Sequence, residues 1–212
     1  CIMNFKDVKE LAYALKLIHS KSLYHGHLNP HNIVINEQKE PILTDFGNLY
    51  RIKPENNHFL CFNEDDLYLA PEFFSFEDDK YEPSSFSDVY SFAIIVFQIL
   101  YDCFRYNGKN IKKPPFNVAK HVLKGRRFDL PDSDVIPKEF KKMISECWSQ
   151  KPSERGTMED IVKNLESGDL VLNGCDMDVY NNYIQKLKTI NNQKENKVEK
   201  SNEDTDTAYF EF

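Results

Sequence analysis

The chain has 212 residues, of which 41% are hydrophobic and 29% charged, so it is long enough to bury one sizeable core. Its formal net charge of −7 argues against a nucleic-acid surface, because phosphate binding needs a basic patch. The sequence has no apolar run of about 18 residues and no basic-then-apolar start, so we expect neither a membrane span nor a signal peptide.

The cysteines indicate the cellular compartment. They are scattered, and no pair has the spacing of a metal site. We therefore expect free thiols in a reducing, cytoplasmic environment. The chain opens on a cysteine rather than Met, directly into a helical pattern, which we interpret as a truncated product or an incomplete gene model. The five cysteines are Cys1, Cys61, Cys103, Cys147 and Cys175.

The first predicted elements are a helix and a β-hairpin. Apolar residues at helical spacing predict a helix that is buried along one face. Two short apolar runs, residues 33–35 and 42–43, flank a polar stretch and predict two strands joined by a turn. Residues 48–69 show no periodicity, and we expect a long ordered loop there. The helical stripe consists of Leu11, Ala14, Leu15 and Ile18.

The second half of the chain is predicted to be mostly helical. Residues 92–100 are nearly all apolar, which is typical of a helix inside a core. Ser87 or Asp88 is expected to cap the N-terminus of this helix. Three further helices are expected, and Thr157 or Gly156 is expected to start the last of them. Their ranges are residues 117–124, 138–147 and 158–165.

Two regions are expected to differ from this helical pattern. Residues 101–115 are rich in Asn, Gly, Lys and Pro, which predicts a loop. Residues 168–188 form a short extension that can hold one more amphipathic helix, and residues 189–212 are predicted to be a disordered acidic and polar tail. The tail has too little apolar surface to offset the entropy of ordering. The helix of the extension would bury Tyr180, Tyr183, Ile184 and Leu187.

Residues 25–32 and 45–47 carry the strongest functional signal. The first segment reads His-Gly-His-Leu-Asn-Pro-His-Asn, and the second reads Asp-Phe-Gly. Together they resemble the catalytic loop and the metal-binding loop of protein kinases, whose usual patterns are His-Arg-Asp-Leu-Lys-Pro-x-Asn and Asp-Phe-Gly. The family residues are kept at His25, Leu28, Pro30 and Asn32. They are replaced at Gly26, His27 and Asn29.

Further motifs follow in the order of the kinase family. Residues 70–72, Ala-Pro-Glu, resemble the triplet that ends the activation segment, and Asp88 lies in a stretch that resembles the start of the buried central helix. Trp148 and Arg155 resemble the closing signature of the tyrosine-kinase-like group. The resemblance implies an ion pair between Arg155 and Glu72. It extends over residues 5–165, and the chain is identified as a member of the protein kinase superfamily.

Only the larger, helical lobe of a kinase is covered by this resemblance. The Gly-rich loop, the ATP-contacting Lys and its Glu partner belong to the smaller lobe and have no counterpart here. The implied fold class is mainly α: a kinase-like C-terminal lobe over residues 1–167, with a small β-hairpin and no N-terminal lobe.

The replaced residues are those that would carry the chemistry. His27 stands where the catalytic Asp would accept the substrate proton, and such assistance contributes roughly 10²–10⁴-fold to the rate. Asn29 stands where a Lys would stabilise the transferred phosphoryl group. Gly26 replaces the Arg that would bind a phosphorylated activation segment. In parallel, residues 48–69 contain no Ser or Thr, and Asp65 stands where serine/threonine kinases have a Thr.

The positions that support the fold are kept instead. The resemblance assigns this structural role to His25, Phe46, Gly47, Glu72, Asp88, Trp148 and Arg155.

Asn32 and Asp45 match the metal ligands of the family. One interpretation is that they bind Mg–ATP, and the other is that they only form hydrogen bonds with the local backbone. ATP and Mg are therefore the candidate cofactors, and the sequence requires neither. A separate metal site at the histidines of residues 19–31 is disfavoured, because no Cys or Asp cluster completes it.

These observations predict a catalytically impaired kinase domain, a pseudokinase that acts as a binding or scaffolding module in signalling. The surface that a smaller lobe would cover favours protein partners, such as another kinase or a segment that supplies the N-terminal lobe. Nucleic acid and membrane are not expected partners. The alternative is an ATP-dependent serine/threonine-type kinase whose N-terminal lobe is missing from this chain, with His27 as an unusual base. A third interpretation is a decayed fragment without function.

Overall fold

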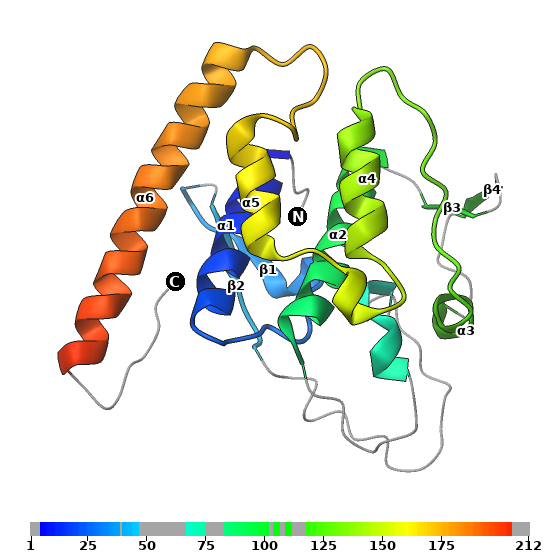
Figure 1. Ribbon diagram of the computed structural model, residues 1–212, viewed down its shortest axis with the longest axis horizontal. Helices are drawn as coiled ribbons and strands as arrows, with labels where there is room; N and C mark the ends of the chain where they lie inside the picture. Colours follow the sequence, from blue (N-terminus) through cyan, green and yellow to red (C-terminus); the bar gives the residue numbers. More distant parts are fainter. Residues whose placement is uncertain are drawn as a thin grey trace.

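The computed structural model describes residues 5–38, 40–46, 67–74, 83–101, 104–106, 109–111 and 118–204. It is mostly helical, so the mainly α fold that the sequence predicts is confirmed (Figure 1). The first elements are α1 (Phe5–Ser20), the 3-10 turn η1 (Pro30–Asn32), β1 (Ile33–Ile35), β2 (Pro41–Leu43) and the 3-10 turn η4 (Pro71–Phe74). The others are α2 (Ser85–Tyr101), β3 (Phe104–Tyr106), β4 (Lys109–Ile111), α3 (Val118–Leu123), α4 (Lys138–Cys147), η5 (Pro152–Glu154), α5 (Met158–Ser167) and α6 (Met177–Asp204).

Helix α2 forms the centre of the core, and α1 and α4 pack against it. Every residue from 87 to 97 is buried, as expected for a helix without a polar face. Phe97 contacts the rings of Phe128 and Trp148, with centroid distances of 5.1 and 5.6 Å. These aromatic contacts fix the segment before α4 and the end of α4 to the central helix.

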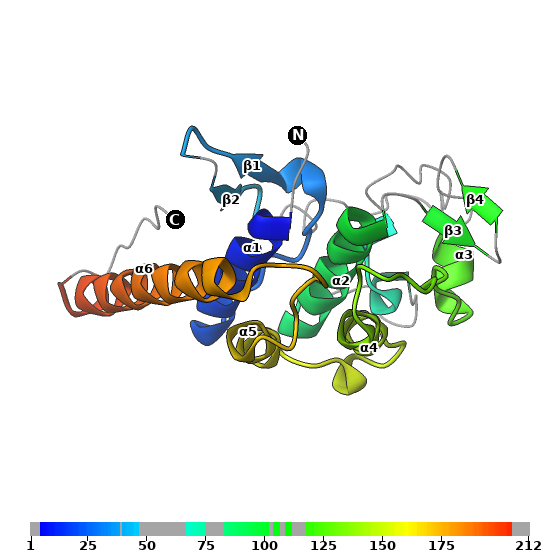
Figure 2. The same cartoon turned by 90° about the horizontal axis from the view of Figure 1, so that it is seen from above.

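The hairpin β1–β2 lies over α1 and forms the surface on which the kinase-like motifs sit. The two strands are antiparallel, with Ile33 opposite Leu43 and Ile35 opposite Pro41. Because side chains alternate along a strand, Ile33 is buried while Val34 is 49% exposed. Figure 2 shows the hairpin on one side of α1 and α5 on the other.

The central helix begins earlier than predicted, and its cap is a different residue. Ser84 precedes α2, and its Oγ accepts the N–H of Ser87 at 3.3 Å, while the N–H of Ser84 donates to Ser87 Oγ at 3.0 Å. Asp88, one of the two predicted caps, lies inside the helix, and its carboxylate binds the backbone of residues 25 and 26 instead. The prediction for α5 is confirmed, because Thr157 caps this helix in a reciprocal capping box with Asp160.

A second hairpin lies within the region that we predicted to be a loop. Strands β3 and β4 are antiparallel, and Tyr106 is opposite Lys109, so only two residues connect them. The sequence at residues 107–108 is Asn-Gly, which favours the tight turn of a two-residue hairpin. The prediction was therefore wrong here, because the loop-like composition of residues 101–115 concealed a turn signal.

Helix α6 runs along α1 and is longer than predicted (Figure 1). It buries Tyr180, Ile184 and Leu187, as expected for the extension. Its helical structure continues to residue 204, however, although we expected disorder from residue 189. Residues 189–204 contain no Gly or Pro, and extending an existing helix avoids the cost of nucleation. Residues 205–212, the rest of the predicted tail, lie outside the described residues.

None of the helices in the described ranges is both long and apolar enough to cross a membrane.

Candidate functional site

The candidate site is the loop between α1 and η1, together with the ends of the β1–β2 hairpin. Within this loop, Gly26 has a φ of +76°, a left-handed conformation that favours glycine. A Cβ atom at this position would lie 2.7 Å from Pro83 Cγ. Any larger side chain at residue 26, including the Arg of the family pattern, would therefore require both strain and movement of Pro83.

Asp88 holds the loop by its backbone. Its carboxylate is almost fully buried and accepts the N–H groups of His25 and Gly26 at 2.8 and 2.9 Å. His19 Nε2 lies 2.9 Å from Asp88 Oδ2 and forms a third polar contact. The predicted structural role of Asp88 is consistent with this geometry, in which a helix residue fixes a loop more than sixty residues earlier in the chain.

His25 is neutral and connects the loop to the hairpin. Its Nε2 lies 3.0 Å from the carbonyl oxygen of Thr44, which can only accept, so Nε2 carries the proton. Its Nδ1 accepts the N–H of His27 at 3.2 Å. Burial lowers the pKa of His25, and the nearby Asp88 carboxylate offsets part of this effect. The ring of Phe46 lies 4.8 Å from the His25 ring, with 38% of Phe46 exposed.

His27 occupies the position of the catalytic Asp and is bound into the same network. The amide Nδ2 of Asn32 donates to the carbonyl oxygen of His27 at 2.9 Å and lies 3.4 Å from His27 Nδ1. Since the amide nitrogen can only donate, His27 Nδ1 is the acceptor in this long contact. The imidazole that replaces the catalytic Asp therefore belongs to the hydrogen-bond network of the loop itself.

Asn29 occupies the position of the catalytic Lys but points inward. The side chain is 1% exposed and caps η1, because Oδ1 accepts the N–H groups of His31 and Asn32 at 2.9 and 3.3 Å. Its Nδ2 donates to the carbonyl oxygen of His27 at 3.1 Å. An ammonium group could not accept these two bonds, so Asn29 organises the loop in a way that Lys cannot.

Asn32 and Asp45, the predicted metal ligands, lie at the same end of the hairpin. The N–H of Thr44, next to Asp45, donates to the carbonyl oxygen of Asn32 at 3.0 Å. Asp45 is exposed and adopts a φ of +59°. An amide oxygen and a carboxylate suit Mg²⁺, which also retains waters or binds phosphates. Across the ranges described above, no group of three or more His, Cys, Asp or Glu side chains could hold a metal ion.

The predicted ion pair between Arg155 and Glu72 is present. The guanidinium forms two parallel bonds of 2.7 Å with the carboxylate. The Arg155 side chain is fully buried, and it also donates to the carbonyl oxygens of Phe86 and Ser149 at 3.0 and 2.9 Å. The pair thus ties η4 to the start of α2 and the end of α4.

Sequence reasoning missed two contributors to the site, His19 and Pro83. His19 lies in the last turn of α1 and Pro83 precedes α2, so each reaches the loop through tertiary contacts. No local pattern indicates either contact. Gly47, Asp65 and most of the predicted activation segment lie outside the described residues.

Comparisons with known proteins identify the family. The family model for the protein kinase domain matches residues 5–165. The chain is 30% identical to serine/threonine-protein kinase 12 of Arabidopsis thaliana over 77% of its own length and 36% of that protein. It is 27% identical to kinase suppressor of Ras A of Caenorhabditis elegans, over 74% of this chain and 21% of that protein.

A third relative is named for a different activity. The receptor-type guanylate cyclase gcy-20 of Caenorhabditis elegans is 28% identical over 76% of this chain and 15% of that protein. In all three cases the chain spans well under half the length of the relative.

Proposed function

The chain belongs to the protein kinase family, and from this membership we propose that it is a catalytically impaired member, a pseudokinase of the tyrosine-kinase-like group. It acts as a binding or scaffolding module in cytoplasmic signalling and transfers no phosphate. The observation that carries this proposal is the loop of residues 25–32, in which the replaced catalytic positions are part of the loop structure itself.

Each replacement is integrated into the fold in a different way. Gly26 provides a left-handed conformation against Pro83. Asn29 caps the following turn from a buried position. The amide nitrogen of Asn32 contacts both the carbonyl oxygen and the ring Nδ1 of His27. An isolated change at residue 27 would leave a kinase loop with one unusual base, whereas these three changes support a loop whose side chains serve structure.

Two contributions to catalysis of phosphoryl transfer are lost. A general base contributes roughly 10²–10⁴-fold, and the carboxylate that would act as the base is replaced by the imidazole of His27, whose Nδ1 lies 3.4 Å from Asn32 Nδ2. The positive charge expected at residue 29 is missing, so the developing charge on a transferred phosphoryl group lacks one of its stabilising partners.

The proposed partner is a protein that covers the hairpin surface. Val34 and Phe46 are exposed there by 49% and 38%. Apolar side chains gathered on a surface favour contact with a partner. The relatives are longer proteins, and one of them is named as a guanylate cyclase, which supports a kinase-like segment serving inside a larger protein.

A phosphotransfer assay tests the proposal. The full-length product is incubated with Mg²⁺, γ-labelled ATP and a general protein substrate, beside the variants His27→Ala and Asp45→Ala. We expect all three proteins to show the same background incorporation of phosphate. If the natural protein transfers phosphate and His27→Ala abolishes this activity, the proposal is wrong.

The alternative is an active serine/threonine-type kinase whose smaller lobe lies upstream, and the retention of Asn32 and Asp45 favours it. These residues would then hold Mg²⁺ between the hairpin and the phosphates of ATP. Sequencing the 5′ end of the transcript distinguishes the two candidates, because an upstream Gly-rich loop and strand Lys would restore the ATP-binding elements. Mg²⁺-dependent binding of a fluorescent ATP analogue that Asp45→Asn abolishes would also favour the alternative.

A further inference from the structure

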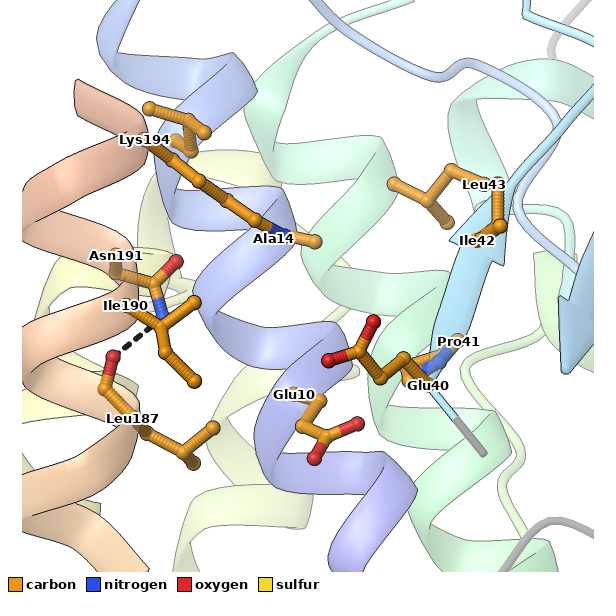
Figure 3. A pocket seen from close by; sticks show the side chains of 11 residues that line it. Glu10, Ala14, Glu40, Pro41, Ile42, Leu43, Leu187, Ile190, Asn191 and Lys194 are labelled. Carbon is orange, nitrogen blue, oxygen red and sulfur yellow. Dashed lines mark hydrogen bonds between the residues drawn. The ribbon is translucent and has the colours of Figure 1, made fainter. Parts of the chain in front are cut away.

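A small pocket lies away from the catalytic loop, between α6, α1 and the start of β2 (Figure 3). Its volume is about 70 Å³, and aliphatic side chains from all three elements form its walls. Helix α6 lies beyond residues 5–165, so the match to the kinase family does not include one wall of the pocket. The apolar lining consists of Ala14, Leu17, Ile42, Leu43, Leu187 and Ile190.

Two carboxylates, from Glu10 and Glu40, lie at one end of this pocket. Figure 3 shows their side chains turned towards the same region, from α1 and from the residue before β2. Glu10 Oε1 accepts the hydroxyl of Tyr183 at 2.7 Å and lies 3.3 Å from Lys6 Nζ. Glu10 Oε2 is buried, and within the described residues it has no hydrogen-bond partner. A buried carboxylate oxygen without a donor is costly, so this atom indicates a missing donor.

Charges of both signs surround Tyr183, because Lys6 Nζ and Lys9 Nζ lie 6.0 and 5.3 Å from its ring centroid while the carboxylate of Glu10 accepts its hydroxyl. Burial raises the pKa of Tyr183, and so do its hydrogen bond to Glu10 and the charges of Glu10, Asp7 and Glu40. Tyr183 therefore remains a donor to Oε1 and leaves Oε2 available. Lys194 also lines the pocket, but the ion pairs seen among the described residues do not join it to either carboxylate.

We propose that this pocket binds a primary alkylammonium group. The ammonium donates charge-assisted hydrogen bonds to Glu10 Oε2 and to Glu40, and an unbranched aliphatic stem packs against the apolar walls. A volume of about 70 Å³ exceeds what a single water molecule needs and suits a short unbranched ion such as butylammonium. A divalent metal ion fits less well, because among the described residues no group of three or more His, Cys, Asp or Glu side chains could hold one, and most of the pocket lining is aliphatic.

Titration calorimetry on the whole chain tests the proposal, with n-butylammonium chloride as the probe and n-butanol as its neutral counterpart. We expect saturable binding of the ammonium, at least tenfold tighter than that of the alcohol. Glu10→Gln and Glu40→Gln should each weaken it at least tenfold. Glu166→Gln is the matched control, because Glu166 accepts the Tyr13 hydroxyl at 2.8 Å and pairs with Lys188 but does not line the pocket.

A second variant guards against misfolding of Glu10→Gln. Ile190→Phe fills the apolar part of the pocket and should abolish binding while both carboxylates remain. Equal binding of the alcohol, binding that survives both Gln variants, or displacement of the probe by millimolar Ca²⁺ would each overturn the proposal. Binding that appears only in Lys194→Met would do the same, because Lys194 would then occupy the pocket in the natural protein.

The source of the ammonium group is decided by a second pair of probes. Nα-acetyl-lysine amide represents the side chain of a partner protein, and n-butylammonium represents a free amine. Tighter binding of the lysine derivative identifies a protein ligand, whereas tighter binding of the free amine identifies a small molecule. Both results support a site for alkylammonium.

Discussion

At the scale of single residues, Asn29 shows how a catalytic position can take on a structural role. Its carboxamide accepts two backbone N–H groups and donates to one carbonyl, all within the same turn. We expect Asn29→Lys to lower the free energy of unfolding by about 2–4 kcal/mol, because the cap is lost and an ammonium is placed in a buried site. Urea denaturation followed by circular dichroism measures this change.

Asn29→Asp is the matched control for that substitution. It keeps the oxygen that accepts both N–H groups, although its second oxygen would face the carbonyl oxygen of His27, so its cost should be smaller than that of Asn29→Lys, which also loses the cap. Equal stability of Asn29→Lys and the natural protein would show that the residue does not cap η1 in solution.

The sequence predicted some residues of the site and missed others for a physical reason. Glu72 and Arg155 were predictable as a pair because each belongs to a motif with a characteristic local pattern. His19 and Pro83 have no such pattern, since their importance comes from contacts with residues distant in the chain. The inward orientation of Asn29 was also missed, although Asn is a preferred N-cap residue and Pro follows it directly.

At the scale of secondary-structure elements, α6 is held to the domain by one apolar face. Ile184 is 2% exposed, whereas Val179 on the same helix is 64% exposed. We expect Ile184→Ala to lower the free energy of unfolding by about 2–4 kcal/mol through lost burial and the cavity left behind. Val179→Ala, the control, should change it by no more than about 0.5 kcal/mol.

The midpoints of urea denaturation of both variants provide the measurement. Similar small effects at the two positions would mean that α6 does not pack against α1 in solution.

Elements with clear start signals were predicted well. The ranges of α4 and α5 follow from apolar periodicity and, for α5, from the Thr157 cap. The end of α6 was not predictable from apolar content, because a helix that is anchored in its first half can continue through polar residues. The β3–β4 hairpin was predictable in principle from its Asn-Gly pair.

At the scale of the whole molecule, the stability should fall on both sides of neutral pH. His25 has a lowered pKa in the folded state, so below the ordinary histidine value of about 6.5 the unfolded chain binds a proton that the folded protein does not. This contribution is complete above pH 6.5 and is lost as the pH falls towards the folded pKa, by up to about 1.4 kcal/mol per pH unit.

On the alkaline side, Tyr180 acts in the opposite direction. Burial raises the pKa of Tyr180 to about 12, so above pH 10 the unfolded chain loses a proton that the folded protein keeps.

Urea titrations between pH 5 and 8 isolate the effect of His25 on the free energy of unfolding. His25→Gln should flatten the pH dependence. A slope that is the same in His25→Gln and the natural protein would contradict the assignment.

The kinase-like architecture was predictable because ordered motifs span residues 5–165, and a helix was expected in residues 168–188, but its packing against α1 was not predicted. The contact between Tyr183 and Glu10 joins residues 173 positions apart, and neither residue belongs to a motif. Pairing at this range depends on how the helices pack, which no local pattern encodes.

The hydrogen bonds between Asp88 and the loop backbone have a consequence for how the sequences of such domains diverge. The carboxylate binds backbone N–H groups, which every residue except proline possesses, and it does so from a helix far along the chain. The course of the loop is therefore inherited independently of the side chain at residue 27. A change at residue 27 alone would leave these two backbone bonds in place, so the path of the loop does not reveal whether the chemistry persists; the side chains do.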